Sequence, residues 1–137
     1  MLKNKHIKII SWVSIACSVV GVVVFLWLLV GYSQASNVAV WLILALSILG
    51  LYAGWDVLKG NKLGKKLLVI FWVIQIIQVT SPSFTFALNT GVSFFLSFGS
   101  DNTVIGLNIF AFIMFLISIR ALREHKYAEV ASDKPSI

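Results

Sequence analysis

The sequence has few of the residues that soluble domains and redox sites depend on. Only 12% of its 137 residues are charged and one residue is cysteine. A soluble domain carries charge on about a quarter of its residues, so this composition argues against one. The single cysteine, Cys17, excludes an internal disulfide and any Cys-x-x-Cys redox or metal pair. We expect no metal site and no bound cofactor.

Catalytic and transport groups are also missing from the sequence pattern. There is no nucleophile paired with a base, no glycine-rich phosphate loop after a strand and no pair of carboxylates within an apolar run. Ionisable residues at membrane depth would mark a transport path, and none is found in the interior of the apolar runs, because the charged residues lie at their ends. We therefore expect a protein that is not an enzyme, with a lipid-modifying enzyme as a distant alternative.

Apolar residues dominate the chain. They make up 59% of it, and the mean hydropathy is +0.96. Four apolar runs approach the roughly 20 residues that cross a bilayer. They predict membrane spans at residues 9–31, 38–58, 63–80 and 103–122. The first run is too long for the apolar region of a signal peptide, although Ser33-Gln34-Ala35 has the look of a cleavage site.

These runs predict an all-α integral membrane protein. We expect a four-helix antiparallel transmembrane bundle that forms one domain over residues 1–137, with a flexible cytoplasmic tail at 124–137. Lys and Arg gather in residues 3–8, 59–66 and 120–126, whereas 81–102 holds one charge, Asp101. Because cytoplasmic segments are enriched in Lys and Arg, both termini are expected in the cytoplasm.

The uncharged segment between the third and fourth runs alternates like a β-strand. Two alternating stretches flank Asn89-Thr90-Gly91, which predicts an extracytoplasmic β-hairpin over residues 83–98. A turn at Thr90 would bury one apolar face, and Phe95 would stand alone on the opposite face as a contact point for a partner. The expected buried residues are Phe84, Phe86, Phe94 and Leu96. The alternative is a re-entrant segment whose residues 89–91 line a conduction path.

Small residues form stripes on the first two predicted helices. Such residues let helix backbones approach closely in lipid, either within one chain or at the seam of a homo-oligomer. The stripes consist of Ser11, Ser14, Ser18 and Gly21 on the first helix and Ser47, Gly50 and Gly54 on the second.

Three amides interrupt the third and fourth apolar runs. Gln75 and Gln78 are three residues apart and would share a helix face, and Asn108 would lie at a similar depth. The amides are expected either to hydrogen-bond across the helix pair or to line a polar pocket.

The cytoplasmic turn carries a weak resemblance. Residues 54–60, GWDVLKG, followed by GKKL at 64–67, resemble the inner turn of small uncharacterised bacterial multi-pass membrane proteins. The resemblance implies a bacterial inner membrane and no activity. A four-helix family of quinone-linked oxidoreductases is rejected because its paired cysteines are missing.

The sequence favours a non-enzymatic scaffold or accessory subunit of a larger membrane assembly or homo-oligomer. Its expected partners are the lipid bilayer and another membrane protein or a second copy, with no nucleic acid. The alternative is a small channel or transporter, formed by oligomerisation around the face of Gln75, Gln78 and Asn108.

Overall fold

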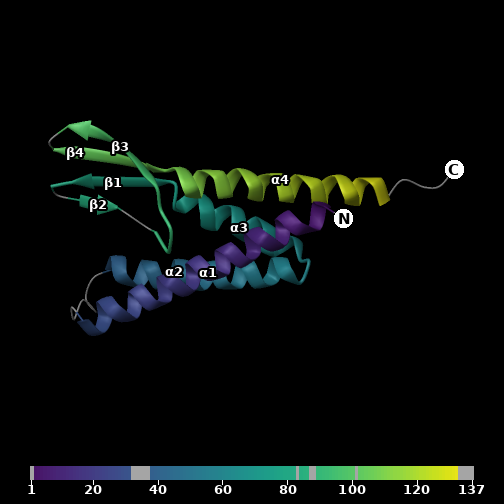
Figure 1. Cartoon of the computed structure of the whole chain (residues 1–137), viewed down its shortest axis with the longest axis horizontal. Coiled ribbons are helices and arrows are strands. Elements are labelled where there is room, and N and C mark those ends of the chain that lie inside the picture. Colours follow the sequence, from purple (N-terminus) through teal and green to yellow (C-terminus); the bar gives the residue numbers. More distant parts are fainter. Residues whose placement is uncertain (1, 32–37, 83, 87–88, 101, 133–137) are drawn as a thin grey trace.

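The computed structural model describes residues 2–31, 38–82, 84–86, 89–100 and 102–132, of which 2–4, 84–86 and 125–132 are described by their backbone alone. The elements follow in the order α1 (Leu2–Gly31), α2 (Val38–Leu58), α3 (Lys62–Ile74), β1 (Ile77–Ser81), β2 (Phe84–Phe86), β3 (Phe95–Ser100), β4 (Thr103–Asn108) and α4 (Ile109–Ser132). Helices α1 and α2 pack along each other, and α3 packs against both α2 and α4. The strands prolong α3 and α4 away from the N-terminus (Figure 1).

The predicted four-helix transmembrane bundle is wrong. Two of the described helices, Lys5–Gly31 of α1 and all of α2, are long and apolar enough to cross a membrane. Helix α3 has 13 residues, or about 20 Å at 1.5 Å per residue, against a hydrocarbon core of about 30 Å. The predicted third and fourth spans each consist of a helix joined to a strand, β1 or β4.

Local sequence explains why the helices give way to strands. Helix α3 ends at Ile74, and the next residues, Ile76 to Thr80, are rich in the β-branched residues that favour strands. Thr103 to Ile105 have the same character in β4. Apolarity alone does not distinguish these strands from helix. Helix α4 continues to Ser132, so the tail expected from residue 124 is helical up to that residue.

The predicted hairpin has the wrong pairing. The four strands form an antiparallel sheet in the order β2-β1-β4-β3, so β2 and β3 lie at opposite edges. Phe86 pairs with Val79 of β1 rather than with Phe94. β3 pairs with β4 along its whole length, from Phe95 opposite Asn108 to Ser100 opposite Thr103. The strand character predicted for 84–86 and 95–98 is confirmed.

The core lies where α1, α2, α3 and the start of α4 meet. Phe71 and Trp72 of α3 are fully buried there, with ring centroids 5.0 Å apart. Trp72 also contacts Phe110 of α4 edge-on, at 5.8 Å between centroids. Its indole Nε1 donates a hydrogen bond of 3.0 Å to the buried Ser14 hydroxyl of α1, which gives the polar end of the ring a partner.

Both small-residue stripes lie in this core, inside a single chain. A Cβ on Gly50 would collide with Ser18 and lie 2.5 Å from the Phe71 ring. A Cβ on Gly54 would lie 3.0 Å from the Ser11 carbonyl oxygen. The remaining members are also buried. These surfaces hold α1, α2 and α3 together and are not exposed to a second copy.

Gly50→Ala is expected to destabilise the fold by about 1–3 kcal/mol, because an added methyl group overpacks the contact with Ser18 and Phe71. Gly31→Ala is the matched control, since its nearest neighbour would be 3.9 Å away. Thermal unfolding of both variants in the same detergent checks this. Equal melting temperatures for the two variants would contradict the packing described.

Candidate functional site

The sheet has one polar and one apolar face. Pairing places Leu96, Leu107 and Ile77 in one row across the sheet, and Ser97, Gly106 and Gln78 in the next row. Because side chains alternate along a strand, these rows point to opposite sides. The apolar face consists of Ile77, Val79, Leu96, Phe98, Ile105 and Leu107.

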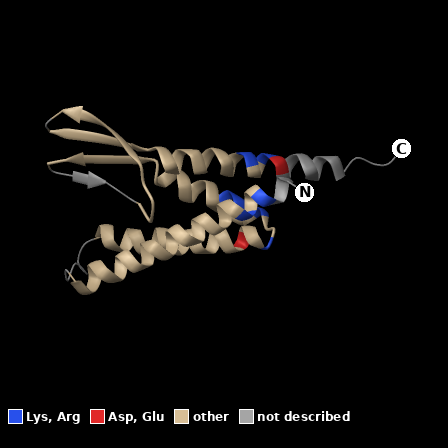
Figure 2. Cartoon of the chain, viewed as in Figure 1, with Lys and Arg blue, Asp and Glu red and all other residues tan. Residues whose placement is uncertain are grey.

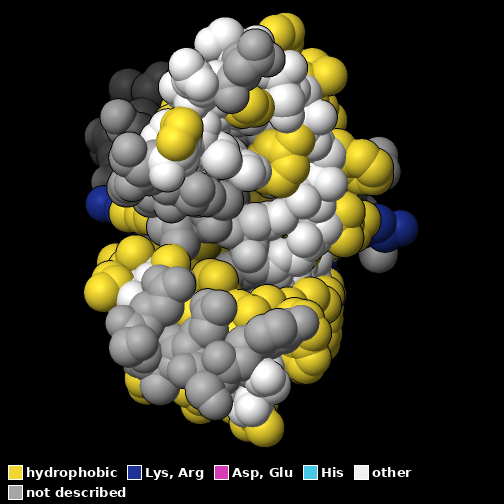
Figure 3. Space-filling view, turned by 90° about the vertical axis from the view of Figure 1, so that its left-hand side faces the viewer, with side chains coloured by type: hydrophobic (Ala, Val, Ile, Leu, Met, Phe, Trp, Pro, Cys, Tyr) yellow, Lys and Arg dark blue, Asp and Glu magenta, His cyan; other side chains and the backbone are white. Residues whose placement is uncertain are grey.

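The apolar face is the one that faces outward. Phe98 is 66% exposed, and Ile77, Leu96 and Ile105 are each more than half exposed. The alternation predicted for β3 is therefore right, but the prediction that Leu96 and Phe94 are buried is wrong. The side chains of Phe84 and Phe86 lie outside the described residues. Seen from the sheet end, hydrophobic and uncharged groups make up the described surface, with Lys and Arg only at its rim (Figure 3).

The polar face is turned toward the inside of the protein. Gly106 and Asn108 of this face are buried, and Gln78 is half-buried. Phe95 lies on the same face and packs over Gly106, where a Cβ would come within 3.3 Å of its ring. Phe95, expected to be a lone exposed contact point, is 36% exposed and partly covers its neighbour in β4.

Residues 89–94 enter the molecule between the sheet and the helices. The carboxamide Oε1 of Gln75 accepts two hydrogen bonds from Thr90, from its N–H and its hydroxyl, each 3.1 Å long. Nε2 of Gln75 donates to the Phe71 carbonyl at 3.1 Å. Thr90 is 1% exposed and meets α1 at Gly21, where a Cβ would lie 2.9 Å from the Thr90 Cβ. The hydrogen bonds fix the segment to the end of α3, and the close approach to Gly21 places it against α1.

The next residue confirms how closely the segment approaches α1. A Cβ on Gly91 would lie 2.8 Å from the Cβ of Cys17, so only glycine fits there without displacement. This inward course takes the place of the turn that the predicted hairpin would make at Thr90. Of residues 89–91, proposed to line a conduction path, Thr90 and Gly91 instead pack against α1, and Thr90 is bonded to Gln75.

The three predicted amides are on three different elements. Gln75 caps the C-terminus of α3, Gln78 lies in β1, and Asn108 is the residue before α4. Asn108 Oδ1 accepts from the Ala111 N–H at 3.2 Å, which is the N-cap bond of a helix, and from the Phe94 N–H at 3.4 Å. The prediction that Gln75 and Gln78 share a helix face is wrong because α3 ends before Gln75.

The outer edge of β3 is open in the part of the chain that the structure describes. The Ile109 N–H donates to the Phe94 carbonyl at 2.8 Å, so Phe94 directs its backbone toward β4. Bonding direction alternates along an antiparallel ladder. Phe95, Ser97 and Gly99 therefore direct their N–H and C=O groups away from β4. All six β3 residues are exposed, and none is charged or proline.

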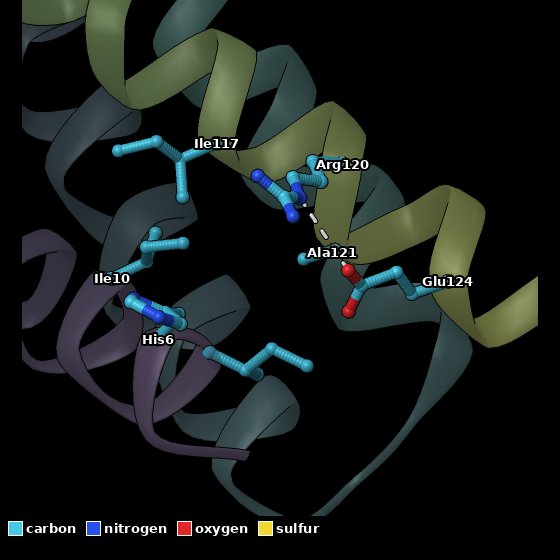
Figure 4. A pocket seen from close by; sticks show the side chains of 7 residues that line it. His6, Ile10, Ile117, Arg120, Ala121 and Glu124 are labelled. Atoms are coloured by element: carbon cyan, nitrogen blue, oxygen red, sulfur yellow. Dashed lines mark hydrogen bonds and ion pairs between the residues drawn. The ribbon is translucent and has the colours of Figure 1, made fainter. Parts of the chain in front are cut away.

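The opposite end of the molecule carries the charge. Among the described side chains, Lys and Arg gather at the ends of α1, α3 and α4 near the N-terminus (Figure 2). A pocket of about 430 Å³ opens there between α1 and α4. His6, Arg120 and Glu124 line it together with apolar side chains (Figure 4). Among the described residues no three His, Cys, Asp or Glu side chains are placed to hold a metal ion.

Sequence reasoning missed the open edge, the bonds to Thr90 and the pocket. Asn108 before an apolar run was a usable N-cap signal, and it would have moved the start of the helix from residue 103 to residue 109. The Gln75–Thr90 pair links residues 15 apart and left no local pattern. Comparisons with protein-family models, curated proteins and solved structures found no match.

Gln75→Leu is expected to lower stability more than Thr90→Val. Leucine leaves two buried donors of Thr90 without an acceptor, at about 1–3 kcal/mol each, whereas valine removes one bond worth about 1 kcal/mol. Gln78→Leu, on the half-buried β1 position, is the control and should change little. Denaturation in detergent gives the three values, and a Gln78 variant as damaged as the Gln75 variant would contradict the network.

Proposed function

We propose that this protein is a non-enzymatic membrane scaffold or accessory subunit whose open β3 edge pairs with a strand of another membrane protein. The single observation that carries the proposal is that edge, a row of outward backbone groups beside an exposed apolar face.

Exposed apolar side chains surround the helices, which supports a membrane placement. Trp12 and Trp27 of α1 are each 59% exposed, and Trp55 of α2 is 57% exposed. Soluble monomers rarely expose large continuous apolar surface. Lys and Arg at one end alone match the distribution at a cytoplasmic membrane surface (Figure 2). In this placement α1 and α2 cross the bilayer and both termini are cytoplasmic.

The sheet then begins inside the membrane. Helix α3 starts at the basic end and covers about 20 Å, so β1 starts about 10 Å below the outer boundary of a 30 Å hydrocarbon core. The outward apolar face suits contact with lipid. The edge does not, because each unpaired N–H or C=O in hydrocarbon costs several kcal/mol. Phe95 and Ser97 are the outward-bonding residues nearest the membrane interior, so the edge needs a protein partner.

The direction of the strands favours a different chain over a second copy. An antiparallel pair of β3 with β3 would turn the second copy upside down in the bilayer. The Lys and Arg residues of that copy would then lie on the outer side. The other edge strand, β2, has three residues, and its pairing with β1 leaves one residue, Thr85, directed outward. A second copy therefore offers β3 no matching antiparallel edge, and the parallel pairing of two β3 strands that remains is the less stable kind. A partner strand that runs toward the cytoplasm pairs with Phe95, Ser97 and Gly99 in the favoured antiparallel way.

The channel alternative receives less support from the geometry. It needs Gln75, Gln78 and Asn108 on one face, and these residues are divided among the C-cap of α3, β1 and the end of β4. The carboxamide of Gln75 is already bonded to Thr90 and Phe71.

Labelling tests the placement in the membrane. In a Cys17→Ser background, Ser100→Cys should react with an impermeant maleimide from outside the cell, and Asn61→Cys should react only after permeabilisation. Both residues are exposed, so access depends on the side of the membrane and not on burial. Equal labelling of the two from one side would overturn the placement.

Ser97→Pro tests the edge. Proline removes the outward N–H of Ser97 and leaves the bonds to β4 intact, so the fold should keep its melting temperature while the partner dissociates. Phe98→Pro is the control, because its N–H points to β4, and it should lower the melting temperature. Native mass spectrometry in mild detergent reports the complex. A wild-type chain that carries no second protein, or a complex that survives Ser97→Pro, would refute the proposal.

A further inference from the structure

The pocket at the basic end is built in two levels along the helix axes. His6 of α1 and Arg120 and Glu124 of α4 lie nearer the cytoplasmic surface (Figure 4). Ile10 lies about one helical turn deeper than His6, and Ile117 lies about one turn deeper than Arg120 and two turns deeper than Glu124. A turn of helix is about 5.4 Å. The pocket therefore has polar groups at the headgroup level and an apolar floor toward the hydrocarbon. This is the arrangement of a phospholipid, with a polar head above an acyl chain.

The apolar floor continues into the exposed surface of α4. Ile113 is four residues before Ile117, so it lies on the same side of the helix, and it is 49% exposed. On α1, Ile7 and Ile10 face the same pocket. An acyl chain that leaves the pocket can therefore run along the surface between the two helices without crossing a polar group.

The polar level holds charges of both signs. Arg120 Nε donates to Glu124 Oε1 at 3.4 Å, on an arginine whose side chain is 82% exposed. Exposed pairs of this kind contribute little stability, so a ligand can rearrange this one. The guanidinium has five N–H donors, of which this bond uses one, and the His6 ring supplies another donor across the pocket.

We propose that this pocket binds one phospholipid with a zwitterionic, amine-bearing headgroup, of the phosphatidylethanolamine type. Arg120 and His6 bind its phosphate and Glu124 accepts hydrogen bonds from its ammonium group. A headgroup with both charges satisfies both members of the Arg120–Glu124 pair. An anionic headgroup such as phosphatidylglycerol leaves Glu124 beside a like charge, and the methylated amine of phosphatidylcholine has no N–H to donate.

This inference rests on the membrane placement proposed above and not on the β3 edge. Loss of the labelling difference between Ser100→Cys and Asn61→Cys would remove the placement itself. Intact labelling together with absent headgroup selectivity would remove the pocket's role alone, and would leave the scaffold proposal standing.

The test uses the full chain, delipidated in mild detergent and offered an equimolar mixture of the three phospholipids with identical acyl chains. Native mass spectrometry should show retention of phosphatidylethanolamine over each of the other two by about tenfold, the size expected for one charge-assisted hydrogen bond. Glu124→Gln should abolish the preference over phosphatidylcholine, so that the ratio of the two retained lipids is about one. Arg120→Gln should abolish retention of all three lipids.

Arg123→Gln is the matched control, because it removes the same charge from the same helix outside the pocket. It should leave retention unchanged. Equal losses in the Arg120 and Arg123 variants would mean general surface attraction and would overturn the site. So would a preference for phosphatidylglycerol, or displacement of the lipid by an equal concentration of soluble glycerophosphoethanolamine, which would identify a site for free phosphate esters.

Discussion

The side-chain amide of Gln75 is the contact on which the arrangement of the outer half depends. It follows the last residue of α3, and it accepts both polar donors of Thr90. These bonds hold residues 89–94 against α1, so that β3 starts on the far side of the sheet from β2. Without an acceptor at this position, Thr90 would be a buried polar residue lacking partners, and the segment would gain nothing by entering the helices.

The inward segment in turn explains the orientation of the sheet. Asn108, on the polar face of the sheet, joins the segment to the start of α4, because its Oδ1 accepts from the N–H groups of Phe94 and Ala111. The face left outside is the apolar one. A sheet with its polar side partly covered and its apolar side exposed is stable where the surroundings are apolar, and this is the arrangement on the lipid side of membrane β-structure. In the proposed membrane placement, the helices and the sheet therefore face the same apolar solvent.

The sequence predicted which segments are apolar better than it predicted whether each segment is a helix or a strand. Runs 9–31 and 38–58 were predicted as spans, and α1 and α2 meet the length and apolarity for that role. The runs at 63–80 and 103–122 were also mainly apolar, but their outer parts are strands, because hydropathy does not report backbone conformation. The hairpin prediction failed for a related reason. The strand β2 pairs with β1. The apolar character of β1 predicts a helix there, so the nearer stretch at 92–98 was the predicted partner of β2. The contact between Thr90 and Gln75 could not be predicted, because it depends on the tertiary fold and leaves no local sequence pattern.

A helix joined to a strand changes what each half of the protein must satisfy. In α3 and α4 the backbone bonds are internal, so their inner halves can face lipid on any side. In β1 and β4 the backbone hydrogen bonds run between strands, so each strand needs a neighbouring strand on both sides. Unpaired N–H and C=O groups therefore remain at the two edges of the sheet. The β2 edge is short and has one outward residue, which limits the free-energy cost of unpaired backbone groups there. The β3 edge has six residues, three of them directed outward, with no proline or charge to block a partner. The stability of this chain in lipid should therefore depend on what pairs with β3, whereas its inner half does not depend on a partner.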